Sequence, residues 1–142
     1  MSNWIIYALM AAVSASFVTI FSKLGVSTLP ASLATTVRSI IMAVFLIIVS
    51  LSRGDFSNMS QLMSQKNNLL FLVFSGIAGA MSWLFLNMAL KEGKAWQVAP
   101  IDKLSVVLTV IISVLIFKEE ITIKGIIGVA FIALGSILVA LA

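Results

Sequence analysis

The sequence predicts an all-α membrane protein, a bundle of five transmembrane helices. Hydrophobic residues make up 61% of the 142 residues, charged residues make up only 10%, and the mean hydropathy is +1.19. Soluble domains do not carry such a composition. The apolar residues are gathered in five stretches, each about as long as a bilayer is thick. We therefore expect one membrane domain over residues 1–142.

The five spans are expected to be helices, because lipid offers no hydrogen-bond partners to bare backbone amides. Pro30 closes the first connection, where it ends one helix and can start the next, and Gly93 closes the third as an expected left-handed cap. Both connections are predicted to be tight antiparallel hairpins. The predicted spans cover residues 4–24, 31–51, 69–90, 96–117 and 121–141.

The connection of residues 52–68 is the only long polar segment of the sequence. A plain solvated loop is the interpretation that we favour for it. Phe56, Met59 and Met63 fall near helical spacing, so a short helix at the membrane interface is the alternative.

The composition also restricts the classes of function. The sequence has no Cys and no His, which removes thiol nucleophiles, disulfides, most zinc geometries and the usual proton shuttle. With so few acids we expect no enzyme, no metal site and no cofactor. The basic residues lie mostly singly at the ends of apolar stretches, where cations anchor spans at the interface. The expected surroundings are therefore a lipid bilayer and not a nucleic acid.

The loop cations bear on how the chain is oriented. Five spans place the first and last residues on opposite sides of the membrane. An excess of one cation on the N-terminal side weakly favours a cytoplasmic N-terminus, and the near balance is compatible with insertion in both orientations. The N-terminal side carries Arg53, Lys66, Lys118 and Lys124, and the opposite side carries Lys23, Lys91 and Lys94.

Three ionisable residues lie well inside predicted spans, away from the span ends: Arg38, Asp102 and Lys103. A charge at the bilayer centre costs at least ~2.5 kcal/mol, so such residues usually face protein or water and have a partner. The second and fourth spans start on the same side of the membrane. Arg38 lies seven residues and Asp102 six residues beyond the start of its span, so both are expected ~10 Å inside. The two side chains can therefore meet.

Two interpretations of these charges stay open. In the functional one, Arg38 or Lys103 holds an anionic group of a substrate, while Asp102 sets their charge state or relays a proton. In the structural one, Arg38 and Asp102 form a buried pair that fixes helix packing, and Lys103 extends its amine outward. Asp102 is the only acid within the predicted spans, so any proton coupling is expected to involve it.

Three further residues in the spans are candidates for a substrate path. Pro100 removes one backbone donor near the start of the fourth span, which predicts either a functional kink or a helix that simply starts late. Trp83 and Asn87 lie at i and i+4 on one face of the third span. That face can line a substrate cavity, or Asn87 can bond to a neighbouring helix.

Small residues at regular spacing predict close helix packing rather than chemistry. Such spacing recurs in the third span, and in the fifth span two glycines are one heptad apart. Whether the contacts form within or between subunits stays open. The glycines concerned are Gly76, Gly79, Gly128 and Gly135.

Taken together, these residues resemble the EamA-type domain of the drug/metabolite transporter superfamily, over essentially the whole chain. The chain looks like a single-domain member with five helices. It departs from many members by lacking an aromatic residue near Val13, and from the four-helix multidrug relatives by having no acid before Asp55. The resemblance rests on Ser-Phe-Val at 16–18 with Ser-Lys at 22–23, on Arg38, and on a run from Ala-Leu at 89–90 through Phe-Lys-Glu at 117–119 to Ile-Ile-Gly at 126–128.

The resemblance implies a fold and a function. Members with ten helices are two such domains joined in inverted orientation, with the substrate path between them. A lone five-helix domain then needs a second copy, and the near balance of loop cations favours an antiparallel homodimer. The implied function is secondary transport of a small metabolite by alternating access across the cell (inner) membrane. Amino acids, amines, organic acids and nucleotide sugars all occur as substrates among relatives.

Two other functions stay open at the level of sequence. One is a lipid flippase subunit that pairs with a different half-domain. The other is a membrane scaffold or accessory subunit that transports nothing. Solute flux through purified protein in vesicles would distinguish the transport hypotheses from the scaffold hypothesis.

Overall fold

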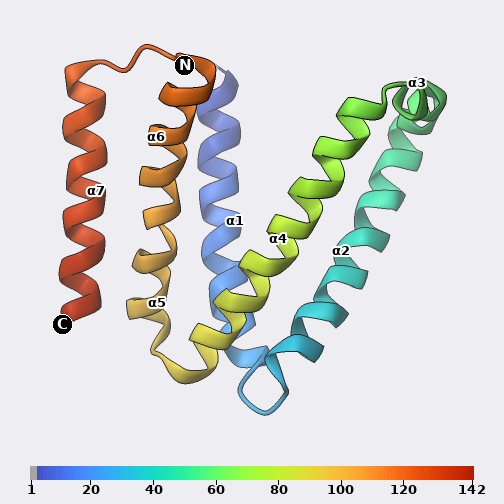
Figure 1. Ribbon diagram of the computed structural model, residues 1–142. Coiled ribbons are helices and arrows are strands. Elements are labelled where there is room, and N and C mark those ends of the chain that lie inside the picture. Colours follow the sequence, from blue (N-terminus) through green and yellow to red (C-terminus); the bar gives the residue numbers. More distant parts are fainter. Residues whose placement is uncertain (1–2) are drawn as a thin grey trace. The chain divides into compact units, whose positions relative to one another are not determined.

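The computed structural model describes residues 3–142, and this part of the chain is helical with no strand. Five helical segments are long and apolar enough to cross a membrane, which confirms the predicted fold class. Their bounds agree with the predicted spans to within three residues (Figure 1). The segments are α1 (Asn3–Gly25), α2 (Ala31–Arg53), α4 (Lys66–Glu92), α5 (Ala95–Asp102) continued by α6 (Leu104–Phe117), and α7 (Ile123–Leu141).

The chain forms two compact units. The first, which we call the terminal unit, contains α1 up to Lys23 and the chain from Glu92 onward, and so includes α5, α6 and α7. The second, the central unit, is Leu24–Lys91 and includes α2 and nearly all of α4. One domain over residues 1–142 stays a prediction.

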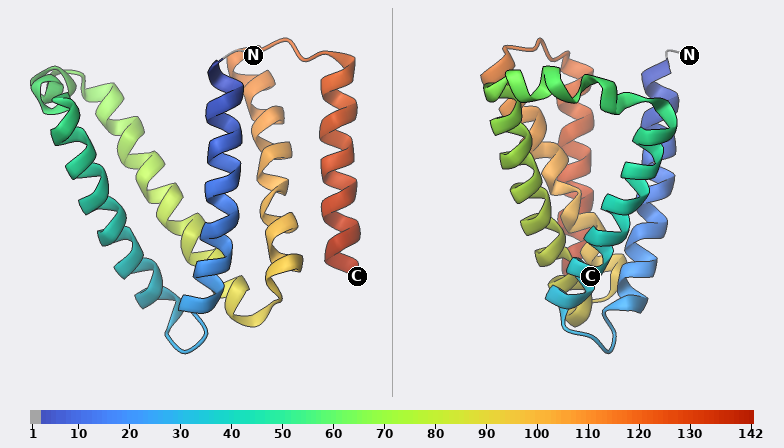
Figure 2. Two further views of the ribbon diagram at one scale, coloured as in Figure 1. Left: turned by 180° about the vertical axis from the view of Figure 1, so that it is seen from behind. Right: turned by 90° about the vertical axis from the view of Figure 1, so that its right-hand side faces the viewer.

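In the terminal unit, α7 packs along both α5 and α6 (Figure 2). Phe117 ends α6, and Lys118 follows with a left-handed backbone at φ 53°. The fifth span was predicted from residue 121, but the helix begins at Ile123. Thr122 explains the difference, because its side-chain oxygen accepts a hydrogen bond from the amide of Gly125 at 3.2 Å and so caps the helix.

The predicted left-handed cap at Gly93 is wrong. Among residues 3–142, positive φ occurs at Gly54 and Lys118. After Gly93 the chain passes through an extended Lys94 and re-enters a helix at once, at Ala95. The carbonyl of Gly93 accepts a hydrogen bond from Lys23 Nζ at 2.7 Å, so a side chain satisfies this helix end and a glycine cap is not required.

The central unit corrects the prediction for residues 52–68. We favoured a solvated loop, but the segment folds into a 3-10 turn, η1 (Asp55–Asn58), followed by the short helix α3 (Met59–Ser64). Gly54 ends α2 in the left-handed conformation at φ 73°. Phe56 and Met59 then line a small cavity of about 220 Å³. The turn η1 contacts both α2 and α3, so the segment is folded rather than extended.

In the first connection the predicted place of Pro30 is confirmed, and the hairpin stays a prediction. Pro30 lies immediately before α2, and its carbonyl accepts the amide of Ala34 at 3.1 Å, which closes the first turn. Lys91 Nζ donates to the carbonyl of Leu29 at 3.1 Å, so a lysine near the end of α4 satisfies the loop before α2.

Few side chains are buried. Large apolar residues such as Phe71 and Phe131 are about 70% exposed, as expected for helices whose outer faces contact lipid. A Cβ atom added at the four glycines predicted to mark packing meets no described atom within 4 Å. Close packing at these glycines, within or between copies, therefore stays a prediction. They are Gly76, Gly79, Gly128 and Gly135.

Candidate functional site

The five candidate residues fall into two groups, one in each unit. Arg38, Trp83 and Asn87 belong to the central unit, and Asp102 and Lys103 belong to the terminal unit. Each group makes contacts within its own unit. The predicted pair of Arg38 and Asp102 joins residues of different units and stays a prediction.

Asn87 is held by a hydrogen bond that crosses from α4 to α2. Its side chain is 1% exposed, and its Nδ2 donates to Thr35 Oγ1 at 2.8 Å. Thr35 gives its own hydroxyl hydrogen to the carbonyl of Ala31 at 2.7 Å. A hydroxyl has one hydrogen, so Thr35 can only accept from Asn87, which settles the orientation of the amide. The other amide atom, Oδ1 of Asn87, is buried and has no partner within residues 3–142.

Arg38 is stacked on Trp83. The guanidinium carbon lies 3.2 Å from the centre of the Trp83 ring, a cation–π contact that helps to hold a charge inside a span. Stacking occupies one face of the guanidinium and leaves its N–H groups, which point outward in the plane, to find other partners. Nη1 is buried and forms no hydrogen bond with the described part of the chain.

Sequence reasoning found three members of this cluster and missed Thr35. The signal was present, because Thr35 lies three residues before Arg38 and therefore shares its side of the helix. It also lies four residues inside α2, while Asn87 lies five residues from the end of α4. These similar depths predict that the two side chains meet. For the open choice at Asn87, the structure shows a bond to a neighbouring helix.

In the terminal unit the fourth span is broken. Asp102 ends α5, Leu104 begins α6, and Lys103 forms the turn between them. The amide of Lys103 contacts the carbonyls of Ala99 at 3.3 Å and of Pro100 at 3.1 Å, which tightens the last turn of α5. Pro100 lies inside α5 rather than before it, so the interpretation in which it starts the helix late is wrong.

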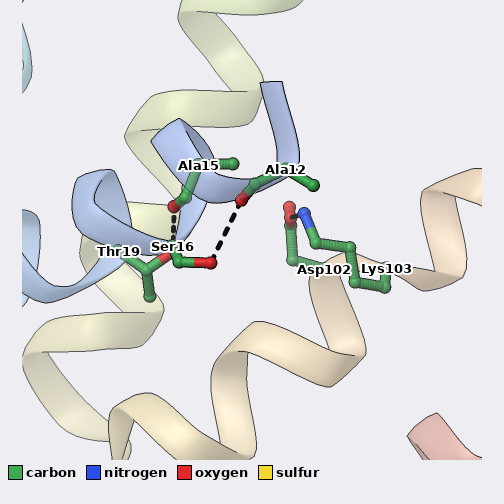
Figure 3. A network of polar contacts seen from close by, with 6 residues as sticks. All are labelled: Ala12, Ala15, Ser16, Thr19, Asp102 and Lys103. Carbon is green, nitrogen blue, oxygen red and sulfur yellow. Dashed lines mark hydrogen bonds and ion pairs between the residues drawn. The ribbon is translucent and has the colours of Figure 1, made fainter. Parts of the chain in front are cut away.

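Asp102 and Lys103 form an ion pair at this break, with 3.1 Å between Oδ2 and Nζ (Figure 3). The Asp102 side chain is 32% exposed and that of Lys103 is 54% exposed. Lys103 is thus accessible and has its neighbour as a partner. The pair places a cation and an acid together where the helix is interrupted.

A cavity of about 740 Å³ lies beside the break, between α1 and α5. Small side chains leave the room for it, and Trp96 and Lys103 give it an aromatic surface and a cation. Its volume is in the range of small-molecule sites. The hydroxyls of Ser16 and Thr19 donate to the carbonyls of Ala12 and Ala15 (Figure 3). The cavity is lined by Ala12, Ala15, Ser16, Thr19, Ile20, Ala95, Trp96, Ala99 and Lys103.

This cavity was not predicted from the sequence. The spacing contained a signal: Trp96, Ala99 and Lys103 follow one another at i, i+3 and i+7, the spacing of one helix face. The facing helix α1 carries small residues at similar spacing, which reads equally well as a packing stripe. The sequence does not show whether such small residues contact a neighbouring helix or line a cavity; the three-dimensional arrangement does.

Comparisons with known proteins agree with the described architecture. The chain is 36% identical over 138 residues to an uncharacterised transporter in the cobO 3′ region of Sinorhizobium sp., covering 97% of this chain and 96% of that protein. It is 33% identical over 73 residues to an uncharacterised protein of Methanocaldococcus jannaschii, covering 51% and 53% of the two chains. No solved structure shows a significant match.

Residues 2–141 match the EamA-like transporter family. This match points to a transporter rather than an enzyme, and together with the five apolar helices it makes the chain an integral, multi-pass membrane protein. The chain therefore belongs to the EamA-like transporter family.

Proposed function

We propose that this protein is a secondary transporter of the cell (inner) membrane that moves a small metabolite by alternating access as a homodimer. The observation that carries the proposal is the interruption of the fourth span at Lys103, which lines a cavity of about 740 Å³ and is paired with Asp102. Transporters commonly build substrate and ion sites where a spanning helix is discontinuous, because the interrupted backbone and the half-helix ends can then contact the cargo.

The ion pair supplies a mechanism of coupling. When Asp102 is ionised it neutralises Lys103 across 3.1 Å. When Asp102 takes up a proton, Lys103 is left as a free cation at the cavity and attracts an anionic group of the substrate. The N-terminus of α6, directly after Lys103, adds a partial positive charge to the same place. Proton and anion would therefore load together.

A second copy of the chain completes the transport path in this proposal. Alternating access in inverted-repeat transporters requires two halves that exchange conformations around a shared site. The loop cations number four on one side and three on the other, which favours insertion in both orientations. An antiparallel homodimer is the assembly that follows.

The proposal is tested by flux into vesicles that contain the purified protein. A panel of labelled metabolites is offered with and without an inward proton gradient. We expect a gradient-dependent uptake that Asp102→Asn abolishes, because the asparagine cannot take up a proton. Asp55→Asn is the matched control, since Asp55 lies outside the spans in η1. If no metabolite enters vesicles that contain folded protein, the transport function is wrong.

A further inference from the structure

The central unit contains two buried polar atoms whose hydrogen bonds are missing. Within residues 3–142, Nη1 of Arg38 and Oδ1 of Asn87 are the buried side-chain atoms without a partner. Leaving a buried polar group unpaired is unfavourable, most of all for a charged one. One atom is a charged donor and the other is an acceptor, so the two require complementary partners.

The two atoms belong to one cluster. Arg38 lies over the ring of Trp83, and Asn87 follows Trp83 on the same face of α4, one turn later. Four residues of helix rise about 6 Å. A partner that reaches both atoms is therefore the size of a small metabolite or a headgroup.

The surroundings of the two unpaired atoms determine which kind of partner each can bind. The bond from Thr35 to Ala31 forces Asn87 to present its carbonyl oxygen, which accepts hydrogen bonds only. Trp83 covers a face of Arg38 and supplies no acceptor in the plane of the guanidinium. The cluster therefore presents a cation next to an acceptor.

We propose that Arg38, Trp83 and Asn87 form a two-point recognition site for an acid that carries an N–H or O–H donor close to its acid group. Arg38 binds the acid group through charge-assisted hydrogen bonds, and Asn87 Oδ1 accepts from the donor. Small amino acids and hydroxy acids share this chemistry, and so does the ethanolamine phosphate headgroup of a lipid. As a substrate class, this assignment rests on the proposed transport function, and the site is separate from the cavity at Lys103, which belongs to the other unit.

A protein carboxylate would satisfy only half of the cluster. Asp102, the partner predicted for Arg38 from the sequence, is an acceptor when ionised and has no hydrogen to give to Asn87 Oδ1. A ligand that bears both an acid and a donor satisfies both atoms at once. This difference makes the proposal specific enough to test with matched compounds.

Binding is measured on purified protein in detergent, as the shift of its thermal unfolding by four compound pools. The pools are small α-amino acids, the corresponding 2-hydroxy acids, the same acids without the amino group, and the amino acid amides. We expect the first or second pool to raise the unfolding temperature clearly more than the third, and the amides to have no effect. Ethanolamine phosphate is a fifth sample; stabilisation by it alone supports the site and assigns it to a lipid headgroup.

Two variants test the residues. Arg38→Gln should weaken binding by roughly tenfold or more, because it removes a charge-assisted bond. Asn87→Leu keeps the number and branching of the side-chain heavy atoms and leaves Thr35 bonded to Ala31. It should lower the affinity for amino acids to that for the acids without the amino group. Ser82→Ala, at an exposed position beside Trp83, is the control and should bind as the wild type does.

Several results would overturn the proposal: stabilisation by no sample, equal stabilisation by the amides, or unchanged binding in a folded Arg38→Gln or Asn87→Leu variant. These results are distinct from failure of the transport function, because the binding assay needs no flux. Binding without flux in vesicles would support the recognition site and contradict the transport function. Flux that is unchanged in both variants would support the transport function and contradict the recognition site.

Discussion

The side chains of Asn87 and Thr35 join α4 to α2 through a hydrogen bond of 2.8 Å between two buried groups. The two residues are 52 positions apart in the sequence. Because Thr35 passes its own hydrogen to Ala31, the bond also determines which atom of the Asn87 amide faces away from it. The contact that connects the two helices thus orients the free oxygen of the cluster.

Thr35→Val should destabilise the central unit. Valine keeps the shape of threonine but cannot accept a hydrogen bond, so Nδ2 of Asn87 loses its partner. Interhelical hydrogen bonds in membrane proteins contribute about 0.5–2 kcal/mol, and we expect a loss of that size in unfolding in detergent. Adding Asn87→Leu should recover part of it, because the amide is then absent. Purely additive losses would show that the two residues do not interact.

Asp102→Asn and Lys103→Gln should be non-additive in the same assay. Removing the acid leaves Lys103 as an uncompensated cation within the fourth span, at an expected cost of about 1 kcal/mol for a partly exposed pair. The double variant should be more stable than the sum of the single losses predicts. A parallel cycle with Arg38→Gln tests the pair predicted from sequence. Stronger coupling of Asp102 to Arg38 than to Lys103 would establish that pair instead.

Insertion in both orientations follows from the near balance of the loop cations. Reporters fused to the C-terminus should be found on both sides of the membrane, and two additional lysines near Asp55 should bias the protein to one orientation. Reporter signal from one side only would contradict the proposal of an antiparallel homodimer.

Gly128→Leu should weaken dimerisation and leave the stability of the single chain unchanged. A Cβ at Gly128 meets no described atom within 4 Å, so we expect the larger side chain to be tolerated within one copy and to obstruct close approach of a second. The assay is the monomer–dimer equilibrium in detergent, with Ile126→Leu, an exposed position on the same helix, as the control. An unchanged equilibrium would mean that this face of α7 contacts lipid.

Most of the fold could be predicted because a bilayer imposes a length and an apolar composition on each span. The wrong predictions concern segments in which side-chain contacts determine the backbone conformation. Lys23 bonds to the carbonyl of Gly93, so no glycine cap forms, and contacts of η1 with α2 and α3 accompany a helical second connection. Neither effect is visible in hydropathy.

The individual candidate residues could be predicted from the sequence, but which of them contact one another could not. A charge within a span is conspicuous in sequence, which is how Arg38 and Asp102 were found. Their partners Trp83 and Lys103 depend on side-chain direction, which the depth along a helix does not give. For Lys103, the long side chain folds back to the carboxylate of the preceding residue, a contact that helical spacing rules do not predict.

The central claim, transport by alternating access, is tested most directly by counterflow. Vesicles that contain the purified protein are preloaded with an unlabelled substrate, diluted into a trace of the labelled compound, and followed with no proton gradient. Alternating access predicts a transient accumulation of label inside above its external concentration, because a carrier returns more often with labelled cargo while unlabelled cargo leaves. Label that rises only to equilibrium, at the same rate with and without preloading, would contradict it.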